Sequence, residues 1–353
     1  MFSIDARSKL LFQQQWQGML SEYVTRVAWS PDGILVASSA AGEVVVWQEN
    51  SLATLLPPTD QSIDCLAFSV DGQFLAAGGQ DGKVRVWKFK EKPELIATLD
   101  NAPKWVDRLS WNPTKNQLAY SFGRSVQIWD AETQRVIATL PFMDSSILCM
   151  SWRPNGQSLA IAGNKGAKIW DATNWDDDPY VMDMPAASIA IAWSEDGKYI
   201  ASGNLDNTIT VLEWGNPNPW VMRGFPGKIR NLAWSRSFNN NAPLLAASSV
   251  EGIAVWKKEA KEIDGWNARV LTLHDGVIEG LAFQPNSLLL ASAADDGWLC
   301  LWEKAKQVGQ ILDEVPEGFS CLAWHPQGKQ LAAGGQQGEL LVWTESKRGK
   351  GFG

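Results

Sequence analysis

The sequence predicts an all-β fold, a single propeller of eight four-stranded antiparallel blades. A unit of three apolar strands recurs eight times, the residues that close successive units lie 40 to 46 positions apart, and Gly-bearing turns return at a fixed place between the strands. A self-similar period of about 40 residues with several strands per unit is typical of propeller arrays. From the end of the first strand to the end of the third, the units cover residues 29–47, 68–87, 111–129, 152–170, 193–212, 234–256, 283–302 and 324–343.

The second unit shows how each element follows from the residues. Its expected strands cover residues 63–68, 74–78, 84–87 and 95–99. Small and large apolar residues alternate in the first of them, as in a strand that is buried on both faces. Asp71-Gly72 and Asp81-Gly82 separate the strands, because Asp and Gly adopt tight-turn conformations at little cost. The first of these turns returns as Pro31-Asp32-Gly33 in unit one and as Pro326-Gln327-Gly328 in unit eight.

Eight such sheets bury both of their faces when they stand radially in a closed ring. The last unit lacks an outer strand of its own, so we expect residues 9–17 to supply it, with Leu10–Trp16 beside Leu340–Trp343. The chain is then one domain over residues 1–353, with a closing strand (9–17), eight repeats (18–343) and a basic C-terminal tail (344–353). Seven blades are the alternative. They require one unit to lie outside the ring, and the fifth, with Leu212 in place of Trp, comes closest.

Seven third strands end in Trp, and Trp129-Asp130 and Trp170-Asp171 form Trp-Asp pairs. With the repeat itself, these residues make the chain resemble the WD-repeat β-propeller family over residues 9–343. The resemblance implies a scaffold that binds a protein or peptide. It also implies that the partner docks on the face formed by the loops that enter the first strands and by the turns between second and third strands.

Charge and composition limit the function classes. The net charge of −8 leaves no broad basic field, which disfavours binding to nucleic acid. No apolar run reaches the ~18 residues of a membrane helix, and Met1–Leu20 lacks the apolar stretch of a secretory signal. Four scattered cysteines are too few for a disulfide framework. We therefore expect a monomeric cytoplasmic protein without membrane insertion, cofactor or metal.

Exposed positions that differ from blade to blade suit a specific binding surface on a uniform scaffold. Such positions lie three and four residues before each first-strand aromatic, and others lie in the loop just before it. Trp298 also holds a third-strand position that the other units fill with small, polar or charged residues. The expected partner-binding residues are Arg26, Asp64, Lys104, Trp105, Asp107, Arg108, Lys228, Arg230, Asn231, Glu279 and Trp298. Trp and Arg are common interface anchors. The insertion Ser237–Pro243 marks a second candidate surface, on the opposite face.

His274 lies nine residues before Phe283, where WD repeats place the His of a structural hydrogen-bond network. By resemblance, Ser292, Asp296 and Trp302 are its partners in the same unit. A catalytic Ser-His-Asp set is the competing interpretation, and we expect the structural one. The other histidine, His325, lies in a turn and is expected to be exposed.

Cys65, Cys149 and Cys321 share one repeat position, three residues before the strand-closing aromatic. A metal cluster is one interpretation. A requirement for a small buried side chain is the favoured one, because Ala190 and Gly280 fill the same position in other units. The chain has no H-E-x-x-H, C-x-x-C or G-x-S-x-G motif, so we expect no catalytic residue.

The expected function is that of a noncatalytic interaction scaffold. Such a scaffold can serve in the assembly of a larger complex. Two alternatives remain open from the sequence. A propeller enzyme or small-ligand binder would use the central channel, but the inner strands carry no cluster of His, Asp and Glu. An RNA-associated propeller is the other alternative, and the acidic balance argues against it.

Overall fold

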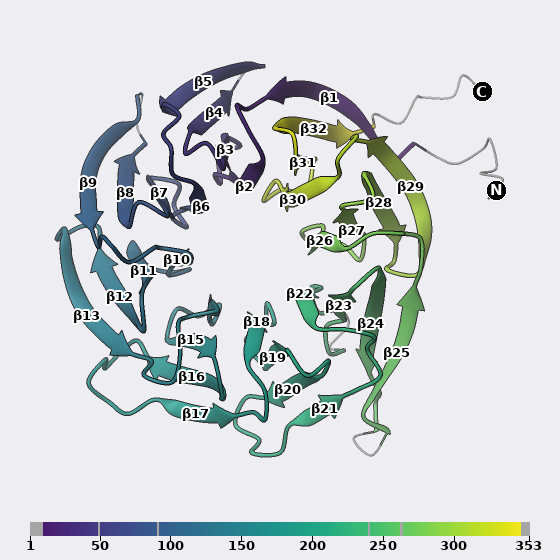
Figure 1. Cartoon of the computed structure of the whole chain (residues 1–353). Helices are drawn as coiled ribbons and strands as arrows, with labels where there is room; N and C mark the ends of the chain where they lie inside the picture. The colour runs from purple at the N-terminus through teal and green to yellow at the C-terminus, as the bar shows by residue number, and fades with distance from the viewer. Residues whose placement is uncertain (1–9, 49, 90–91, 239–240, 262–263, 347–353) are drawn as a thin grey trace.

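The chain forms a closed ring of eight blades (Figure 1). The computed structural model describes residues 10–346 except 49, 90–91, 239–240 and 262–263, and no α-helix occurs in this part of the chain. Each blade is an antiparallel sheet of four strands, with its first strand nearest the axis and its last strand at the rim. The eight-bladed prediction is confirmed. The seven-bladed alternative is wrong, because every unit, including the fifth, forms a blade of the ring.

The strands fall into four concentric layers, and we number the blades 1 to 8 in the order of their innermost strands. The innermost strands are β2 (Val24–Trp29), β6 (Ile63–Phe68), β10 (Leu109–Trp111), β14 (Cys149–Trp152), β18 (Ser188–Trp193), β22 (Ile229–Trp234), β26 (Ile278–Phe283) and β30 (Phe319–Trp324). The second layer is β3 (Leu35–Ser39), β7 (Phe74–Gly79), β11 (Gln117–Phe122), β15 (Ser158–Gly163), β19 (Tyr199–Asn204), β23 (Leu245–Ser249), β27 (Leu290–Ala294) and β31 (Gln330–Gly335). The third layer is β4 (Val44–Gln48), β8 (Lys83–Lys88), β12 (Ser125–Asp130), β16 (Gly166–Asp171), β20 (Ile209–Glu213), β24 (Gly252–Lys258), β28 (Trp298–Glu303) and β32 (Glu339–Glu345). The outer strands are β5 (Ser51–Leu56), β9 (Glu94–Asp100), β13 (Arg135–Pro141), β17 (Tyr180–Asp183), β21 (Trp220–Met222), β25 (Trp266–Leu271), β29 (Gln307–Glu314) and β1 (Phe12–Met19).

Blade 2 shows why the repeated residues form these strands. In the first turn, the Ser69 hydroxyl donates to Asp71 Oδ1 at 2.7 Å and accepts the Phe74 N–H at 3.0 Å. Gly72 then takes the left-handed conformation that closes the turn, with φ of 70°. The strand that follows, β7, is buried along its whole length. A Cβ on Gly78 would lie 2.8 Å from the side chain of Val106 in blade 3, so the small residues of the repeat let neighbouring sheets press together.

The N-terminal strand closes the ring, as predicted. Strand β1 pairs antiparallel with β32, from Phe12 opposite Glu345 to Met19 opposite Glu339. The expected boundaries were wrong by a few residues. The strand continues past residue 17 to Met19, because β32 extends back to Glu339 and offers it a partner. Thr344 and Glu345, expected in the basic tail, belong to β32 because β1 pairs with them. Residues 9 and 347–353 lie outside the described residues.

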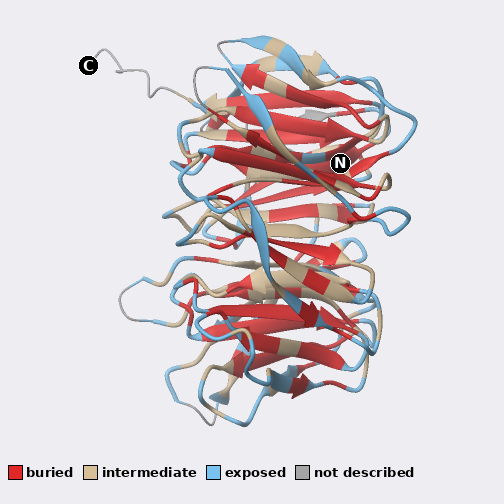
Figure 2. Cartoon of the chain, turned by 90° about the vertical axis from the view of Figure 1, so that its left-hand side faces the viewer, coloured by how far each residue is buried: buried red, intermediate tan, exposed pale blue. Residues whose placement is uncertain are grey.

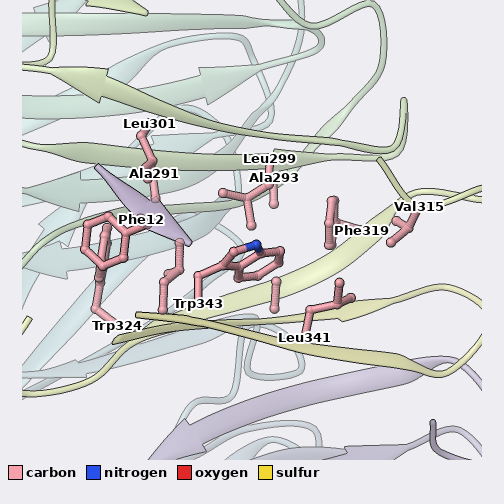
Figure 3. Packing of buried hydrophobic residues seen from close by; sticks show 12 residues of the cluster. Phe12, Ala291, Ala293, Leu299, Leu301, Val315, Phe319, Trp324, Leu341 and Trp343 are labelled. Carbon is pink, nitrogen blue, oxygen red and sulfur yellow. The ribbon is translucent and has the colours of Figure 1, made fainter. Parts of the chain in front are cut away.

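Phe12 and Gln310 hold the closing strand against blade 7. The Phe12 side chain is 2% exposed, and its ring centroid lies 5.3 Å from that of Trp324. Figure 3 shows it in the cluster between blades 7 and 8 that also contains Trp343. The side-chain amide of Gln310, in β29, accepts the N–H groups of Leu11 and Phe12 at 2.7 and 2.9 Å and donates to the Phe12 carbonyl at 2.7 Å. The strand is therefore bonded to its own sheet and to the neighbouring blade.

First-strand tryptophans bond five of the blades to the blade before them. In five cases the indole N–H donates, at 3.0–3.1 Å, to the carbonyl of the residue that precedes the first-strand aromatic of the previous blade. These bonds join Trp29 to Ala323, Trp111 to Ala67, Trp152 to Ser110, Trp234 to Ala192 and Trp324 to Ala282. Phe68 and Phe283 have no such donor, and the Trp193 indole makes no hydrogen bond. At Trp193, Arg153 of blade 4 instead donates to the Gly197 carbonyl at 3.0 Å and lies over the ring.

A second set of bonds runs from six of the blades to the next blade. Side chains near the start of an innermost strand donate to a backbone carbonyl of the following blade. These bonds join Thr25 to Ile63, Cys65 to Val106, Arg108 to Leu148, Cys149 to Ser188, Asn231 to Ile278 and Ser320 to Val24. Ala190 and Gly280 cannot donate from the equivalent position. The repeat position shared by three cysteines therefore lies beside a carbonyl of the next blade, and a thiol is small enough to fit there and can donate weakly.

The two sets of bonds complement each other at the seams, the contacts between adjacent blades. Phe68 and Phe283 provide no indole donor, and the seams after blades 1 and 6 are bridged by Thr25 and Asn231. Ala190 and Gly280 provide no polar donor, and the seams after blades 5 and 7 are bridged by the indoles of Trp234 and Trp324.

The prediction that His325 is exposed was wrong. Its side chain is 7% exposed, and its ring packs edge-on against Trp29 with centroids 5.2 Å apart. Its Nδ1 accepts the Gln327 N–H at 3.0 Å. A Cβ on Gly33 would lie 2.9 Å from its Nε2. The His325 side chain is buried because the first hairpin turns of blades 8 and 1 lie against each other.

Candidate functional site

The loops that enter the first strands and the turns between second and third strands lie together on one face of the ring. In blade 1 the Thr59 N–H donates to the Ala41 carbonyl at 2.6 Å, and in blade 2 the Asn101 N–H donates to the Gly82 carbonyl at 2.9 Å. Figure 2 shows the ring edge-on, with buried strands between two faces of exposed loops. We call the face that carries the loops entering the first strands, and the turns between second and third strands, the loop face. The opposite face carries the first hairpin turns and the insertion Ser237–Pro243, of which residues 239–240 lie outside the described residues.

A cavity of about 430 Å³ opens at the inner edge of the loop face, where blades 5 to 8 and blade 1 contribute side chains. We call it the mouth pocket. Five of the predicted contact residues line it, namely Arg26, Lys228, Arg230, Asn231 and Glu279. Tyr23, Ile189, Ser320 and Leu322 are among the other residues of its wall. Residues that are about 300 positions apart in the chain, such as Tyr23 and Leu322, therefore meet in one site, because the ring brings blade 1 beside blade 8.

The electrostatics of the mouth pocket are dominated by three cations around one carboxylate. Arg230 Nη1 lies 3.6 Å from Glu279 Oε1, with about a third of each side chain exposed. Burial raises the pKa of Glu279 above its usual value and the nearby Asp295 carboxylate raises it further, while Arg230, Lys228 and Arg26 oppose the shift. The Arg26 guanidinium donates to the neighbouring Thr25 carbonyl at 2.8 Å and forms no ion pair among the described residues. The pocket therefore has an excess of positive charge.

Two predicted contact residues are also occupied in holding the ring together. Asn231 Nδ2 donates to Ser248 Oγ at 3.1 Å and to the Ile278 carbonyl at 2.9 Å. Arg108 donates from Nε to the Leu148 carbonyl of blade 4 and from Nη1 to the Asp107 carbonyl, both at 2.8 Å. Substituting either residue would change a seam as well as the surface, so neither is a clean probe of partner binding.

Asp64 and Asp107 lie on the loop face of blades 2 and 3 and do not line the mouth pocket. The Ser62 hydroxyl donates to Asp64 Oδ1 at 2.7 Å. Burial raises the pKa of Asp107, and the nearby Asp64 carboxylate raises it further, while Arg108 opposes the shift. Cations thus outnumber carboxylates in the wall of the mouth pocket, whereas a pair of carboxylates lies near blades 2 and 3.

The remaining predicted residues lie apart from the pocket. Trp105 is 55% exposed. Its neighbour Lys104 places Nζ 4.0 Å from the centroid of the Phe122 ring. Trp298 is half-buried in β28, and its backbone N–H donates to Asp296 Oδ1 at 2.9 Å. The structure therefore divides the predicted set into pocket residues, a carboxylate pair and an outer group.

Tyr23 is a pocket residue that sequence reasoning missed. It lies in the loop before β2, half-buried, and burial raises the pKa of its hydroxyl. A signal for it existed in the sequence. Tyr23, Trp105 and Lys228 each lie six residues before the aromatic that ends a first strand, so a search at that offset would have found Tyr23.

His274 ties the loop before β26 to strands β27 and β28. Its Nδ1 lies 2.9 Å from Asp296 Oδ2 and its Nε2 lies 2.8 Å from Ser292 Oγ. Trp302 Nε1 donates to the same hydroxyl at 2.8 Å. Ser292 is fully buried and His274 is 4% exposed. Because the hydroxyl is enclosed and already bonded on two sides, no substrate can reach it, and the four side chains act as a structural tie.

Of the cysteines, Cys65, Cys300 and Cys321 are buried and Cys149 is partly buried. Burial raises the pKa of the thiols of Cys65, Cys300 and Cys321, and that of Cys149 to about 12, which disfavours the reactive thiolate. Within the part of the chain that the structure describes, no three potential metal ligands come together. No helix there has the length and hydrophobicity needed to cross a bilayer.

Asp107→Asn is expected to stabilise the protein at neutral pH. The raised pKa of Asp107 means that the folded state holds the proton more tightly than the unfolded state does, so folding pays a cost above the folded pKa. The side chain is partly solvated, so we expect a gain of about 0.5 kcal/mol at about pH 7. The gain should fade as the pH falls below the unfolded pKa of about 4, where both states are protonated.

Melting curves of the wild type and of Asp107→Asn, recorded across this pH range, measure the difference. Asp32→Asn, at an exposed turn of the opposite face, is the matched control and should show no such trend. A variant that is less stable than the wild type at neutral pH would contradict the expected sign.

Comparison with known proteins gives matches along most of the chain. The family model described as "WD domain, G-beta repeat" matches residues 12–48, 50–88, 134–171, 184–212, 265–303 and 312–344. The chain is 29% identical over 157 residues to nuclear distribution protein nudF of Aspergillus terreus, which covers 39% of this chain and 35% of that protein. It is 28% identical over 152 residues to pre-mRNA-splicing factor cwf17 of Schizosaccharomyces pombe, or 42% of each chain.

A third relative is small ribosomal subunit protein RACK1 of Caenorhabditis elegans, 27% identical over 125 residues, or 34% of this chain and 38% of that protein. The chain thus matches between 35% and 42% of the length of these three relatives. The matched repeats cover more than half of the sequence and fall on blades of the ring. The chain belongs to the WD-repeat β-propeller family.

Proposed function

We propose that this protein is a noncatalytic scaffold that presents its loop face to a protein or peptide partner. The observation that carries the proposal is the mouth pocket, which gathers charged, aromatic and apolar side chains from five blades at one place on a rigid ring. At the repeat position four residues before the first-strand aromatic, blades 5 to 8 supply Ile189, Arg230, Glu279 and Ser320 to the pocket, so a uniform scaffold presents a varied surface. The exposed Trp105, with Lys104 beside it, offers a second contact point on blade 3 of the same face.

Two features support a noncatalytic role. The buried Ser292-His274-Asp296 arrangement is closed to substrate, and the Cys321 thiol in the pocket wall has a raised pKa. The RNA-associated alternative remains disfavoured, because Asp64 and Asp107 share the loop face with the cations and the chain carries a net charge of −8.

The proposal includes a monomeric form in the cytoplasm. All four cysteines are free thiols, which suits a reducing compartment. The named roles of the relatives concern nuclear distribution, pre-mRNA splicing and the small ribosomal subunit. Since these differ from one another, they assign no pathway to this chain.

Quantitative affinity capture from the cells of origin tests the scaffold. The bait is the full chain, as wild type, as the loop-face variant Trp105→Ala/Arg230→Ala, and as the matched control Lys115→Ala/Lys198→Ala on the opposite face. Arg108 is left unchanged because it bonds blade 4. Truncation of an interface anchor weakens binding by about 2 kcal/mol, so partners retained by the wild type and the control should fall at least about tenfold with the loop-face variant.

All three proteins should melt alike, because the substituted side chains are exposed. Equal capture by all three, or equal loss from both variants, would contradict docking on the loop face. Conversion of a captured small molecule by the wild type would contradict the noncatalytic assignment.

A further inference from the structure

The mouth pocket carries positive charge that the protein does not neutralise. Three cations, Arg26, Lys228 and Arg230, face a single carboxylate, Glu279, in its wall. The chain as a whole has the opposite balance, with 39 acidic and 31 basic residues. An excess of cations at one concave place on an acidic protein is a local feature of this site, and it attracts negatively charged groups there.

The donors of these cations are largely unused. Arg26 donates to one backbone carbonyl, although a guanidinium has five N–H groups. Lys228 is exposed and makes no ion pair among the described residues. Arg230 approaches Glu279 no closer than 3.6 Å, which is longer than a direct hydrogen bond. A ligand that accepts hydrogen bonds and carries negative charge would therefore find donors already in place.

The Glu279 carboxylate is a negative charge of the protein itself, and it lies among these donors. Its carboxylate lies nearest to Arg230, and Lys228 and Arg26 also act on it. It is half-buried, so it has given up part of its hydration without gaining a close hydrogen bond from Arg230. Its negative charge competes with any anion that enters the pocket. Removing that charge while keeping the side chain's shape should leave three cations for the ligand.

We infer that the mouth pocket binds a carboxylate-bearing acidic segment of the partner protein, and that Glu279 weakens this binding by acting as a competing internal carboxylate. The inference rests on the proposed scaffold function and names the chemistry of its partner. Asn231 and Ser320 provide polar groups between the charges, while Ile189 and Leu322 provide an apolar wall. This mixture suits Asp or Glu side chains on a peptide backbone.

The charges on the rest of the loop face favour a peptide over a longer or denser polyanion. Asp64 and Asp107 stand on blades 2 and 3 of the same face. A nucleic acid strand would extend its phosphates toward these carboxylates, and like charges across an interface are unfavourable. A peptide can place its acidic residues over blades 6 and 1 and neutral or basic residues over blades 2 and 3.

Fluorescence anisotropy with defined probes tests the inference on the full-length protein. The probes are a fluorescein-labelled peptide of alternating Gly and Glu, its Gln and Lys counterparts, a phosphoserine peptide and a single-stranded oligonucleotide of equal charge. The wild type is expected to bind the Glu peptide and neither the Gln nor the Lys peptide, with binding weakened by added salt. It should bind the Glu peptide more tightly than the phosphoserine peptide or the oligonucleotide.

Three variants complete the experiment. Arg26→Gln/Lys228→Gln should weaken binding of the Glu peptide about tenfold, since two partly exposed ion pairs are lost. Lys115→Gln/Lys198→Gln removes the same charge from the opposite face and should leave binding unchanged. Glu279→Gln should tighten binding about threefold. A purely structural role of Glu279 would predict the reverse, because loss of the contact with Arg230 would loosen the pocket.

Several results would overturn the inference. Equal binding of the Glu and Gln peptides, equal weakening by the control pair, or weaker binding by Glu279→Gln would each do so. Tighter binding of the phosphoserine peptide or of the oligonucleotide would replace carboxylate with phosphate as the recognised group. If the Glu peptide fails while Trp105→Ala/Arg230→Ala still abolishes partner capture, the scaffold function stands and the acidic-peptide assignment is wrong.

Discussion

Deleting residues 1–17 is expected to open blade 8 and to lower the melting temperature by roughly 10 °C or more. The deletion removes most of the strand that pairs with β32, and with it the buried ring of Phe12 and the three hydrogen bonds to Gln310. It leaves the edge of β32 unpaired and the cluster between blades 7 and 8 open to water. Thermal unfolding followed by circular dichroism measures the change.

A point substitution separates packing from strand pairing. Phe12→Ala should cost about 3–5 kcal/mol, as other large aromatic truncations in cores do, while leaving the backbone bonds of β1 available. Gln13→Ala is the matched control, because Gln13 is the next residue of the same strand and its side chain is exposed. If the deletion melts like the wild type, the ring does not depend on its N-terminal strand. If Gln13→Ala costs as much as Phe12→Ala, the burial of Phe12 is not the cause.

His274→Ala is expected to destabilise the protein by about 2 kcal/mol. The imidazole bonds Asp296 on one side and Ser292 on the other, and its removal leaves a buried hydroxyl and a largely buried carboxylate short of one partner each. Asp296 retains two backbone N–H donors, from Asp275 and Trp298, which limits the loss. Denaturant unfolding at neutral pH measures the free energy of unfolding of the variant and the wild type.

Asp275→Asn is the control for this substitution, since Asp275 is exposed and adjacent to His274. It should be nearly neutral. A double-mutant cycle with Ser292→Ala should give a coupling energy of about 1 kcal/mol, and strict additivity would mean that the two side chains do not interact. Peptide binding at the mouth pocket should survive His274→Ala, because none of the four network residues lines that pocket.

The repeat made the fold accessible to prediction, because each local signal agrees with every other. Turn residues such as Ser69 to Gly72, alternating small and large apolar residues and closing tryptophans recur in phase, and each copy constrains the next. Strand ends were less predictable. They depend on the length of the partner strand, so the extension of β1 to Met19 and of β32 to Glu345 followed from their pairing alone.

The sequence predicted which residues contribute to the candidate site, but not which of them lie together in one pocket. Repeat offsets selected Arg26, Arg230 and Glu279, yet only the closed ring shows that these residues share one pocket while Asp64 and Asp107 lie outside it. The burial of a side chain at a place where two turns meet could not be predicted from the sequence either. His325 looked like an ordinary turn residue because the approach of the blade 1 turn to it is a contact between opposite ends of the repeat array.

The unequal distribution of bonds among the seams has a consequence for substitutions at equivalent positions. Phe68 stands where most units have Trp, and its seam is bridged by Thr25. Ala190 carries no polar donor, and its seam is bridged by Trp234. The seam between blades 2 and 3 has both kinds of bond, from Trp111 and Cys65. A single substitution would therefore leave the first two seams with neither bond and the third with one, so copies of the same repeat position are not interchangeable.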